Sequence, residues 1–439
     1  MSVFGPSPNQ LNLGAQPGTQ IATQTAPNGA MADVFNGSAI PLRNPAATGG
    51  VARPYLLSLS SSTVNLPVAK TTIQLENVGL GLGARLYFNG SIVLNLPAAA
   101  SAGNESGFKV GYNFPFDIVE DASFQPSGSS VRVQGSGVLL REEELRMFGL
   151  RSPNVASSSS HLPTAVTGFG YFTSVSDSLG LFTNGLTPGQ TYYNTSTTTA
   201  DVVTIKFGFY LTLPWVDNFV DMNGLIPMAI QNAAFPINLN LNGVGNNGPI
   251  ALVTEGTGTV GTVTSQSVTI DPEQISVSIP NNPALYTGLA SNAVFRQTKT
   301  LQGGIGTGTD GVQVYFDQGF KYLACINDIR VNYAPISGTD IVDVALNFGP
   351  KTPVETRSYA QYVADYGDRY SLSPNAGIVL WDGQSTAFSP SDGDAFAVVN
   401  AEPGGIVRPH MRIGINSGTS LGPVGTNTCT SLLVSTVLL

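Results

Sequence analysis

Apolar and polar residues alternate along a stretch of the chain that begins near residue 202. Every second position from 203 to 213 carries an apolar side chain: Val203, Ile205, Phe207, Phe209, Leu211 and Leu213. This period of two is typical of a β-strand with one buried face. Pro214 ends the run, because proline has no backbone N–H to donate to a neighbouring strand. The pattern predicts a strand over residues 202–213.

The spacing of apolar residues changes to that of a helix after Asp217. Apolar side chains fall near the positions i, i+3, i+4 and i+7 that share one helix face: Phe219, Met222, Leu225, Ile226 and Ile230. The strand period then returns at Phe235, Ile237, Leu239 and Leu241. Residues 206–240 therefore predict a strand, a short helix and a second strand.

Further strands are predicted on both sides of this segment, separated by clusters of Gly, Asn, Pro or Ser. In the first half they cover residues 71–77, 84–89, 91–96, 130–140 and 267–279. In the second half they cover residues 311–316, 322–333, 340–348, 377–381, 395–400, 410–416 and 431–439, with a short amphipathic helix over 359–368. The Ser-, Thr- and Gly-rich residues 156–199 predict a long exposed loop that includes two strand-like pieces. The second half repeats the outline of the first, without a fixed short repeat.

Composition favours an all-β chain with two domains. Glycine and proline number 50 and 29 among 439 residues, which favours many turns between short strands. One hydrophobic core organises at most about 250–300 residues, so this length predicts more than one core. We predict two tandem eight-stranded jelly-roll β-sandwiches, each with a short helix inserted late in the barrel. They would cover residues 51–285, with long exposed loops, and residues 286–439.

Residues 1–50 lack apolar periodicity and are rich in Pro, Gly, Gln, Asn, Thr and Ala. They predict an extended N-terminal arm, and two interpretations stay open: simple disorder, or an arm that becomes ordered against a neighbouring subunit. The sequence shows no basic-then-apolar signal and no run of about 18 apolar residues. Neither secretion nor a membrane span is expected from this pattern.

The charge balance argues against direct binding to nucleic acid. The net charge is −9, and only 19 Lys and Arg residues are present, whereas binding to a phosphate backbone requires clustered cations. Only 11% of residues are charged, which suits a surface that packs against neighbouring subunits without burying unpaired ions. Cys325 and Cys429 are too few and too far apart for a disulfide framework, and buried free thiols are predicted.

Reactive side chains are few, and we predict no catalytic, cofactor-binding or metal site. His161 follows four serines, but neighbours in one loop do not provide the geometry of a Ser–His–acid triad. His410 opens a predicted strand, where a hydrogen-bonded surface or interface histidine is expected.

Two acidic groups have alternative interpretations. Residues 142–144 are three glutamates between Arg141 and Arg146, and they predict a solvated turn or helix start, with contacts between subunits as the alternative. A second group could bind Ca²⁺ through its oxygens, although its spacing does not match the helix–loop–helix calcium site: Asp382, Asp392 and Asp394.

Glycines and tryptophans complete the candidates. Gly79, Gly81 and Gly83 resemble a phosphate-binding loop only superficially, because the following residues predict a strand and not a helix. Trp215 and Trp381 could stack on sugars, but Trp215 follows Pro214 at the end of a strand and is expected to pack there.

Three blocks of the sequence resemble the double jelly-roll major capsid proteins of tailless icosahedral viruses that enclose a membrane, such as viruses of bacteria or archaea. The blocks are residues 114–137, 207–240 and 359–416, and the resemblance extends over roughly residues 50–439. It implies a homotrimer whose six barrels form a pseudo-hexagonal tile, with the arm reaching inward or sideways and the long loops outside. It also implies a place in the virion after assembly in the host cytoplasm, beside neighbouring capsomers, minor capsid or penton proteins and an internal membrane.

The leading hypothesis is therefore a self-assembling shell protein with no enzymatic activity and no cofactor. The alternative is a secreted or surface β-sandwich adhesin or carbohydrate-binding module, for which Ser-, Thr- and Asn-rich loops would also be expected. A polysaccharide hydrolase with paired carboxylates ranks third.

Overall fold

Antiparallel strands dominate the computed structural model, which describes residues 54–437 except 128–129, 149–165, 168–170, 183–184, 217–225, 229–232, 246–247, 278–295, 318–319, 348–352, 371–373, 383–395, 399–408 and 424. The strands fall into two groups, here called the first barrel (β1 to β15) and the second barrel (β16 to β25). In the described part of the chain, no ladder joins a strand of one barrel to a strand of the other. No helix in that part is long and apolar enough to cross a membrane.

The first barrel contains three sheets. The largest follows the order β1 (Pro54–Ser58), β15 (Thr262–Val277), β4 (Leu80–Leu96), β11 (Asp201–Pro214), β9 (Tyr171–Asp177) and β8 (Val166–Thr167), with β2 (Ser62–Asn65) on β15 and β12 (Ile226–Pro227) on β4. The second sheet comprises β3 (Val68–Gln74), β13 (Pro236–Leu241), β6 (Val119–Phe124) and β7 (Val133–Gly135). The third comprises β10 (Thr191–Asn194), β5 (Ser106–Val110) and β14 (Ile250–Thr254).

The second barrel contains two sheets. One comprises β16 (Arg296–Gly304), β25 (Thr428–Val437), β18 (Phe320–Val331) and β19 (Ala334–Pro335), with β22 (Ile378–Asp382) and β23 (Phe396–Val398) also on β18. The other comprises β17 (Gly308–Tyr315), β24 (His410–Ile415), β20 (Ile341–Asn347) and β21 (Pro353–Ser358). Among the described residues, the helical elements are η1 (Phe116–Ile118) and α6 (Gly137–Phe148) in the first barrel and α8 (Tyr359–Tyr370) in the second.

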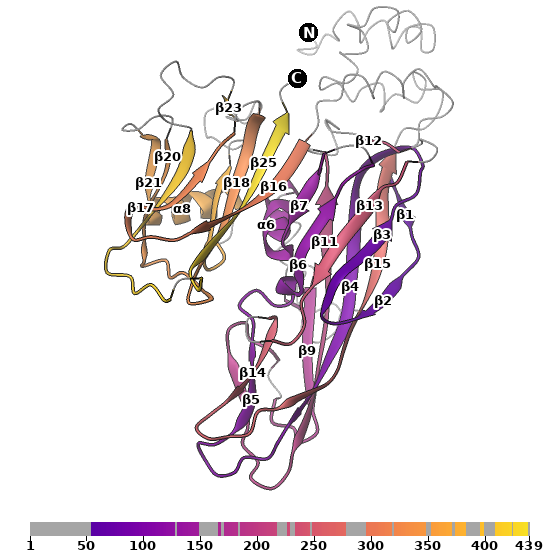
Figure 1. Ribbon diagram of the computed structural model, residues 1–439, viewed down its shortest axis with the longest axis vertical. Helices are drawn as coiled ribbons and strands as arrows, with labels where there is room; N and C mark the ends of the chain where they lie inside the picture. The colour runs from indigo at the N-terminus through magenta and orange to yellow at the C-terminus, as the bar shows by residue number, and fades with distance from the viewer. Residues whose placement is uncertain are drawn as a thin grey trace, which may run out of the picture.

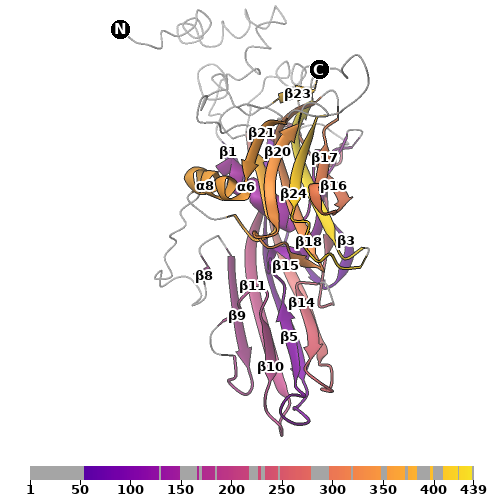
Figure 2. The same ribbon diagram turned by 90° about the vertical axis from the view of Figure 1, so that its left-hand side faces the viewer.

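The long strands β4, β11 and β15 lie side by side along the first barrel and extend well beyond the second (Figures 1 and 2). The alternation predicted for residues 202–213 is confirmed, because Val203, Ile205 and Phe207 are fully buried while Val202 is 46% exposed. Phe209 pairs with Phe88 across the ladder, and their rings stack at 4.7 Å. Alternating apolar residues from facing strands thus fill the core.

One unbroken strand, β4, replaces the two strands predicted at 84–89 and 91–96. Gly90, which suggested a turn, lies within the ladder between β11 and β15. A Cβ atom at this position would lie 2.6 Å from the Ser267 carbonyl oxygen and 2.3 Å from the Phe207 ring. The glycine therefore permits a close approach of strands instead of ending one.

The helix predicted from Asp217 to Ile230 is wrong at its C-terminal end. Ile226 and Pro227 form β12, which pairs with Gly81 and Leu80 of β4, and residues 217–225 and 229–232 lie outside the described residues. A helix that was not predicted, α6, begins at Gly137 and follows β7, so the last residues of the strand predicted at 130–140 are helical instead. The late position predicted for a helix in the first barrel falls mostly on residues outside the described ranges. The second helix, α8, agrees with the prediction and is two residues longer.

Part of the segment predicted as a loop at 156–199 belongs to sheets. β9 pairs with β11 over seven residues, and β10 pairs with β5. The remaining predicted strands of the second barrel are confirmed with shifts of a few residues at their ends. Local periodicity identified these elements, and strand-like pieces were also expected within 156–199, whereas β16 and β21 of the second barrel were not predicted.

Candidate functional site at the junction of the two barrels

The first contact between the barrels is made by two sheet edges. β7 is the last strand of its sheet and lies beside β16, the first strand of the second barrel (Figure 1). The Thr298 amide donates to the Arg132 carbonyl oxygen at 3.0 Å, and the Gln134 amide donates to Thr298 Oγ1 at 3.0 Å. Thr300 Oγ1 also donates to the Gln134 carbonyl at 3.2 Å. These bonds occupy edge groups that would otherwise be free to pair with another chain.

The second contact is made by α6, which lies between the strands of the first barrel and the second barrel (Figure 1). The acidic run on this helix was predicted to be solvated, and that prediction is wrong: Glu142 is 1% exposed and Glu143 is fully buried. Arg146 Nε and Nη2 donate to the two carboxylate oxygens of Glu143 at 2.7 and 2.8 Å. Arg146 Nη1 also lies 3.4 Å from Asp382 Oδ1 of β22. The charges are buried because a second layer of the same chain covers the helix.

The other two glutamates of α6 have separate partners. The Glu142 carboxylate accepts a hydrogen bond from the hydroxyl of Tyr366 of α8, at 3.3 Å, and another from the side-chain amide of Asn375. Burial raises the pKa of Glu142, and these two hydrogen bonds oppose the shift only in part. Glu144 pairs with Arg141 at 2.5 Å and accepts from Thr212 Oγ1 at 2.8 Å. Within the chain, all three glutamates of this acidic run therefore have hydrogen-bond or ion-pair partners.

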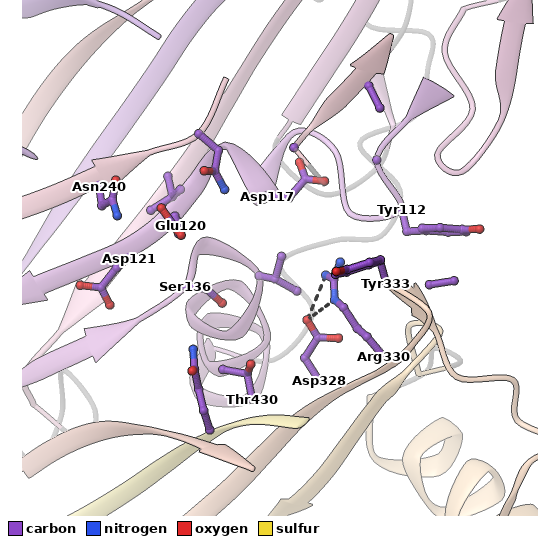
Figure 3. A pocket seen from close by; sticks show the side chains of 18 of the residues that line it. Tyr112, Asp117, Glu120, Asp121, Ser136, Asn240, Asp328, Arg330, Tyr333 and Thr430 are labelled. Atoms are coloured by element: carbon purple, nitrogen blue, oxygen red, sulfur yellow. Dashed lines mark hydrogen bonds and ion pairs between the residues drawn. The ribbon is translucent and has the colours of Figure 1, made fainter. Parts of the chain in front are cut away.

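The third contact surrounds a cavity of about 600 Å³ that residues of both barrels line. Figure 3 shows Asp117 of η1 on one side of it and Asp328 and Arg330 of β18 on the other. Arg330 donates from Nε and Nη2 to Asp328 Oδ2, both at 3.0 Å. Burial raises the pKa of Asp117 to about 7, although Arg330 opposes the shift, and burial also raises the pKa of Asp328.

Two partly exposed tyrosines line this cavity. Tyr112 is 37% exposed and Tyr333 is 47% exposed (Figure 3). Asn332 and Tyr333 form the turn between β18 and β19 with φ of 52° and 63°. A bulky residue in this left-handed region is strained, and asparagine and glycine are the usual occupants of such a hairpin turn.

The candidate residues that the structure describes have separate partners and do not form one site. His161, Asp392 and Asp394 lie outside the described residues. Asp382 pairs with Arg146, and no group of three potential metal ligands occurs in the part of the chain that the structure describes. His410 is 6% exposed and lies 3.1 Å from the Asn347 amide nitrogen, so it is hydrogen-bonded as predicted but buried within the chain.

The remaining candidates are structural. Trp215 is fully buried and stacks on Phe124 at 4.2 Å, as its position after Pro214 predicted. Cys325 and Cys429 are buried and free, and burial raises the pKa of both thiols, to about 12 for Cys429. Gly81 and Gly83 lie within β4, which confirms the strand and leaves no helix N-terminus for a phosphate. Trp381 lies in β22, with its ring 6.3 Å from that of Phe316.

Neither a protein-family model nor a curated protein matches this chain. Among solved structures, it is similar to the crystal structure of the STIV MCP, with 12% identity and a TM-score of 0.53 over 88% of this chain and 97% of that chain. It is also similar to a chain in the atomic structure of Sulfolobus Turreted Icosahedral Virus, with 11% identity and a TM-score of 0.53 over 88% of this chain and 91% of that chain. This chain has the double jelly-roll fold of viral major capsid proteins.

Asp117, Asp328 and Arg330 were not singled out from the sequence, because Asp117 is an isolated charge far along the chain from Asp328 and Arg330. The resemblance of residues 114–137, 207–240 and 359–416 to this group of proteins is confirmed for the fold.

Proposed function

We propose that this chain is a viral major capsid protein that assembles as a homotrimer and tiles an icosahedral shell. The observation that carries the proposal is the alignment of both barrels, in order, with 97% of the length of the STIV MCP. A trimer of double jelly rolls presents six similar barrels, which matches the symmetry of a hexagonal lattice. No enzymatic activity or cofactor is part of the proposal.

The junction supports this function physically. Each chain of such a tile has to hold its two barrels in a fixed relative position. Three contacts along the junction do this: the sheet edge at β7, the helix α6, and the cavity beside β18. Arg146 of α6 pairs with Asp382 of β22 across the junction, so separation of the barrels would break this buried ion pair. The division of the chain at residues 285 and 286 stays a prediction, supported by strands that end at Val277 and resume at Arg296.

The proposed location is the virion, after assembly in the host cytoplasm. The proposed partners are neighbouring capsomers and minor capsid or penton proteins, with an internal membrane on the inner side. The low charged fraction of 11% supports broad lateral contacts, since few ions would have to lose water on assembly.

Deletion of residues 1–45 tests the role proposed for the arm. We expect the shortened chain to keep its trimer and its cooperative unfolding, because residues 1–50 carry no apolar periodicity for a core. We expect closed shells to become rare when particles are counted by electron microscopy beside the full-length chain. Loss of folding in the shortened chain would contradict the assignment of these residues as an arm, and unchanged shell formation would contradict its role in assembly.

A further inference from the structure

The cavity between the barrels, here called the junction cavity, is lined by five polar side chains that make no hydrogen bond or ion pair with any residue that the structure describes. They are Glu120, Asn240, Asn242, Gln302 and Thr430. Figure 3 shows Asn240 and Glu120 on the wall of the first barrel and Thr430 on the facing wall of the second. All five residues are at least partly exposed, so their polar groups are free to bind a ligand in place of water.

Strand alternation places these groups on the outer faces of both barrels. The odd-numbered residues of β13 are buried in the core, so Asn240 lies on the opposite face of that strand. Gln302 lies two positions beyond Thr300 on the same face of β16, and the Thr300 hydroxyl bonds to β7 of the first barrel. The junction cavity therefore collects unpartnered polar groups from two barrels that face each other.

The chemistry of the lining favours an uncharged ligand that is rich in hydroxyl groups. Four carboxylates and two cations line the junction cavity, so its net negative charge disfavours anions. Among the unpartnered groups only Glu120 is charged, and the other four are amides or a hydroxyl, which both donate and accept hydrogen bonds. Sugar hydroxyls have the same two capacities. The volume of about 600 Å³ also lies within the range of about 300–1,000 Å³ that is typical of small-molecule sites.

Tyr333 provides an aromatic surface at the same cavity. Its side chain is 47% exposed, and its φ of 63° is unfavourable for any residue with a bulky side chain. The loop before β25 holds this turn, because the Tyr333 amide donates to the Thr426 carbonyl at 3.0 Å and the Asn332 amide donates to Asn427 Oδ1 at 3.2 Å. Backbone strain that is imposed in this way is typical of ligand-binding sites. The exposed ring can pack against the apolar face of a sugar ring.

We propose that the junction cavity binds an uncharged oligosaccharide, with Tyr333 packing against one sugar ring and with Asn240, Asn242 and Gln302 hydrogen-bonding to its hydroxyl groups. The site needs both barrels, because Tyr333 and Gln302 come from the second and the two asparagines from the first. It goes beyond the shell function proposed above and does not depend on it, since one chain supplies all of these groups.

Titration of the full-length protein with trisaccharides tests this site. Saturation-transfer NMR compares neutral trisaccharides of glucose, galactose, mannose and N-acetylglucosamine with two charged probes, a sulfated trisaccharide and spermidine. We expect at least one neutral trisaccharide to bind with a dissociation constant of about 0.1–1 mM in calorimetry, as suits a small ligand held by a few hydrogen bonds and one ring. Absence of saturable binding by every neutral trisaccharide up to about 10 mM, or binding of a charged probe alone, would overturn the proposal.

Two cavity variants and a control show whether the ligand binds at this place. Tyr333→Gly removes the ring and should keep the fold, because glycine adopts a positive φ readily, and we expect binding to weaken about tenfold. The double variant Asn240→Ala, Gln302→Ala should also weaken binding about tenfold. Tyr315→Ala removes a ring that is 43% exposed in β17, outside the junction cavity, and should bind as the wild type does.

Unchanged binding by the folded Tyr333→Gly chain, or an equal loss in the Tyr315→Ala chain, would overturn the proposal. Tyr333→Gly decides alone should the double variant fail to fold.

Discussion

Arg146→Met is expected to lower the free energy of unfolding by about 3–5 kcal/mol, because it leaves buried carboxylates without their cation. Arg146 holds both oxygens of Glu143, which is fully buried, and also contacts Asp382, whose side chain is 6% exposed. Methionine keeps much of the side-chain volume, so the loss reports on charge more than on packing. Urea denaturation of the full-length chain, followed by tryptophan fluorescence, measures the change.

A matched control for this variant is Lys299→Met. Lys299 pairs with Asp317 at 3.4 Å, but the two side chains are 51% and 43% exposed. Exposed pairs contribute about 0–1 kcal/mol, so little change is expected. Glu143→Gln in the Arg146→Met background should recover part of the loss, since one uncompensated charge disappears. Equal losses for Arg146→Met and Lys299→Met would show that the buried Arg146–Glu143 pair contributes no more to stability than an exposed pair does.

Trp215→Ala is expected to destabilise the first barrel by about 3–5 kcal/mol through the cavity that it leaves. The indole is fully buried and stacks on Phe124, and Gly81 leaves room for it, since a Cβ there would lie 3.2 Å from the indole ring. Thermal or urea unfolding of the full-length chain gives the difference from the wild type.

Trp215→Phe distinguishes packing from hydrogen bonding at the same position. Trp215 Nε1 has no hydrogen-bond partner, so phenylalanine loses ring volume and no polar contact. We expect a loss clearly smaller than that of alanine, about 1–2 kcal/mol. A loss as large as that of alanine would contradict the view that stacking on Phe124 carries the effect.

The sequence predicted those parts of the fold that depend on neighbours along the chain. The period of two in β11 and the helical spacing in α8 are local patterns, and both elements were placed within two residues of their observed ends. Gly90 and Gly137 were misread, because their role depends on what approaches them: a strand at Gly90, and the Phe116 carbonyl at Gly137, 2.3 Å from where a Cβ would lie. A glycine in a sequence indicates only that the backbone can adopt many conformations there. Whether it ends a strand, begins a helix or permits a close contact depends on the surrounding fold.

The junction could not be predicted from the sequence for a related reason. A run of three glutamates between arginines is typical of a solvated surface, and its burial depends on Asp382, which lies 236 positions from Arg146. Asp117 likewise comes to line one cavity with Asp328 and Arg330 only when the second barrel folds against the first. A long-range pairing of this kind has no local period that could reveal it.

The molar mass of the purified full-length protein at micromolar concentration tests the central claim most directly. Light scattering or sedimentation should give a stable species of three times the 45.7 kDa of one chain, before any larger shells appear. A monomer that persists at micromolar concentration would contradict the proposal that this double jelly roll forms the trimeric tile of a capsid.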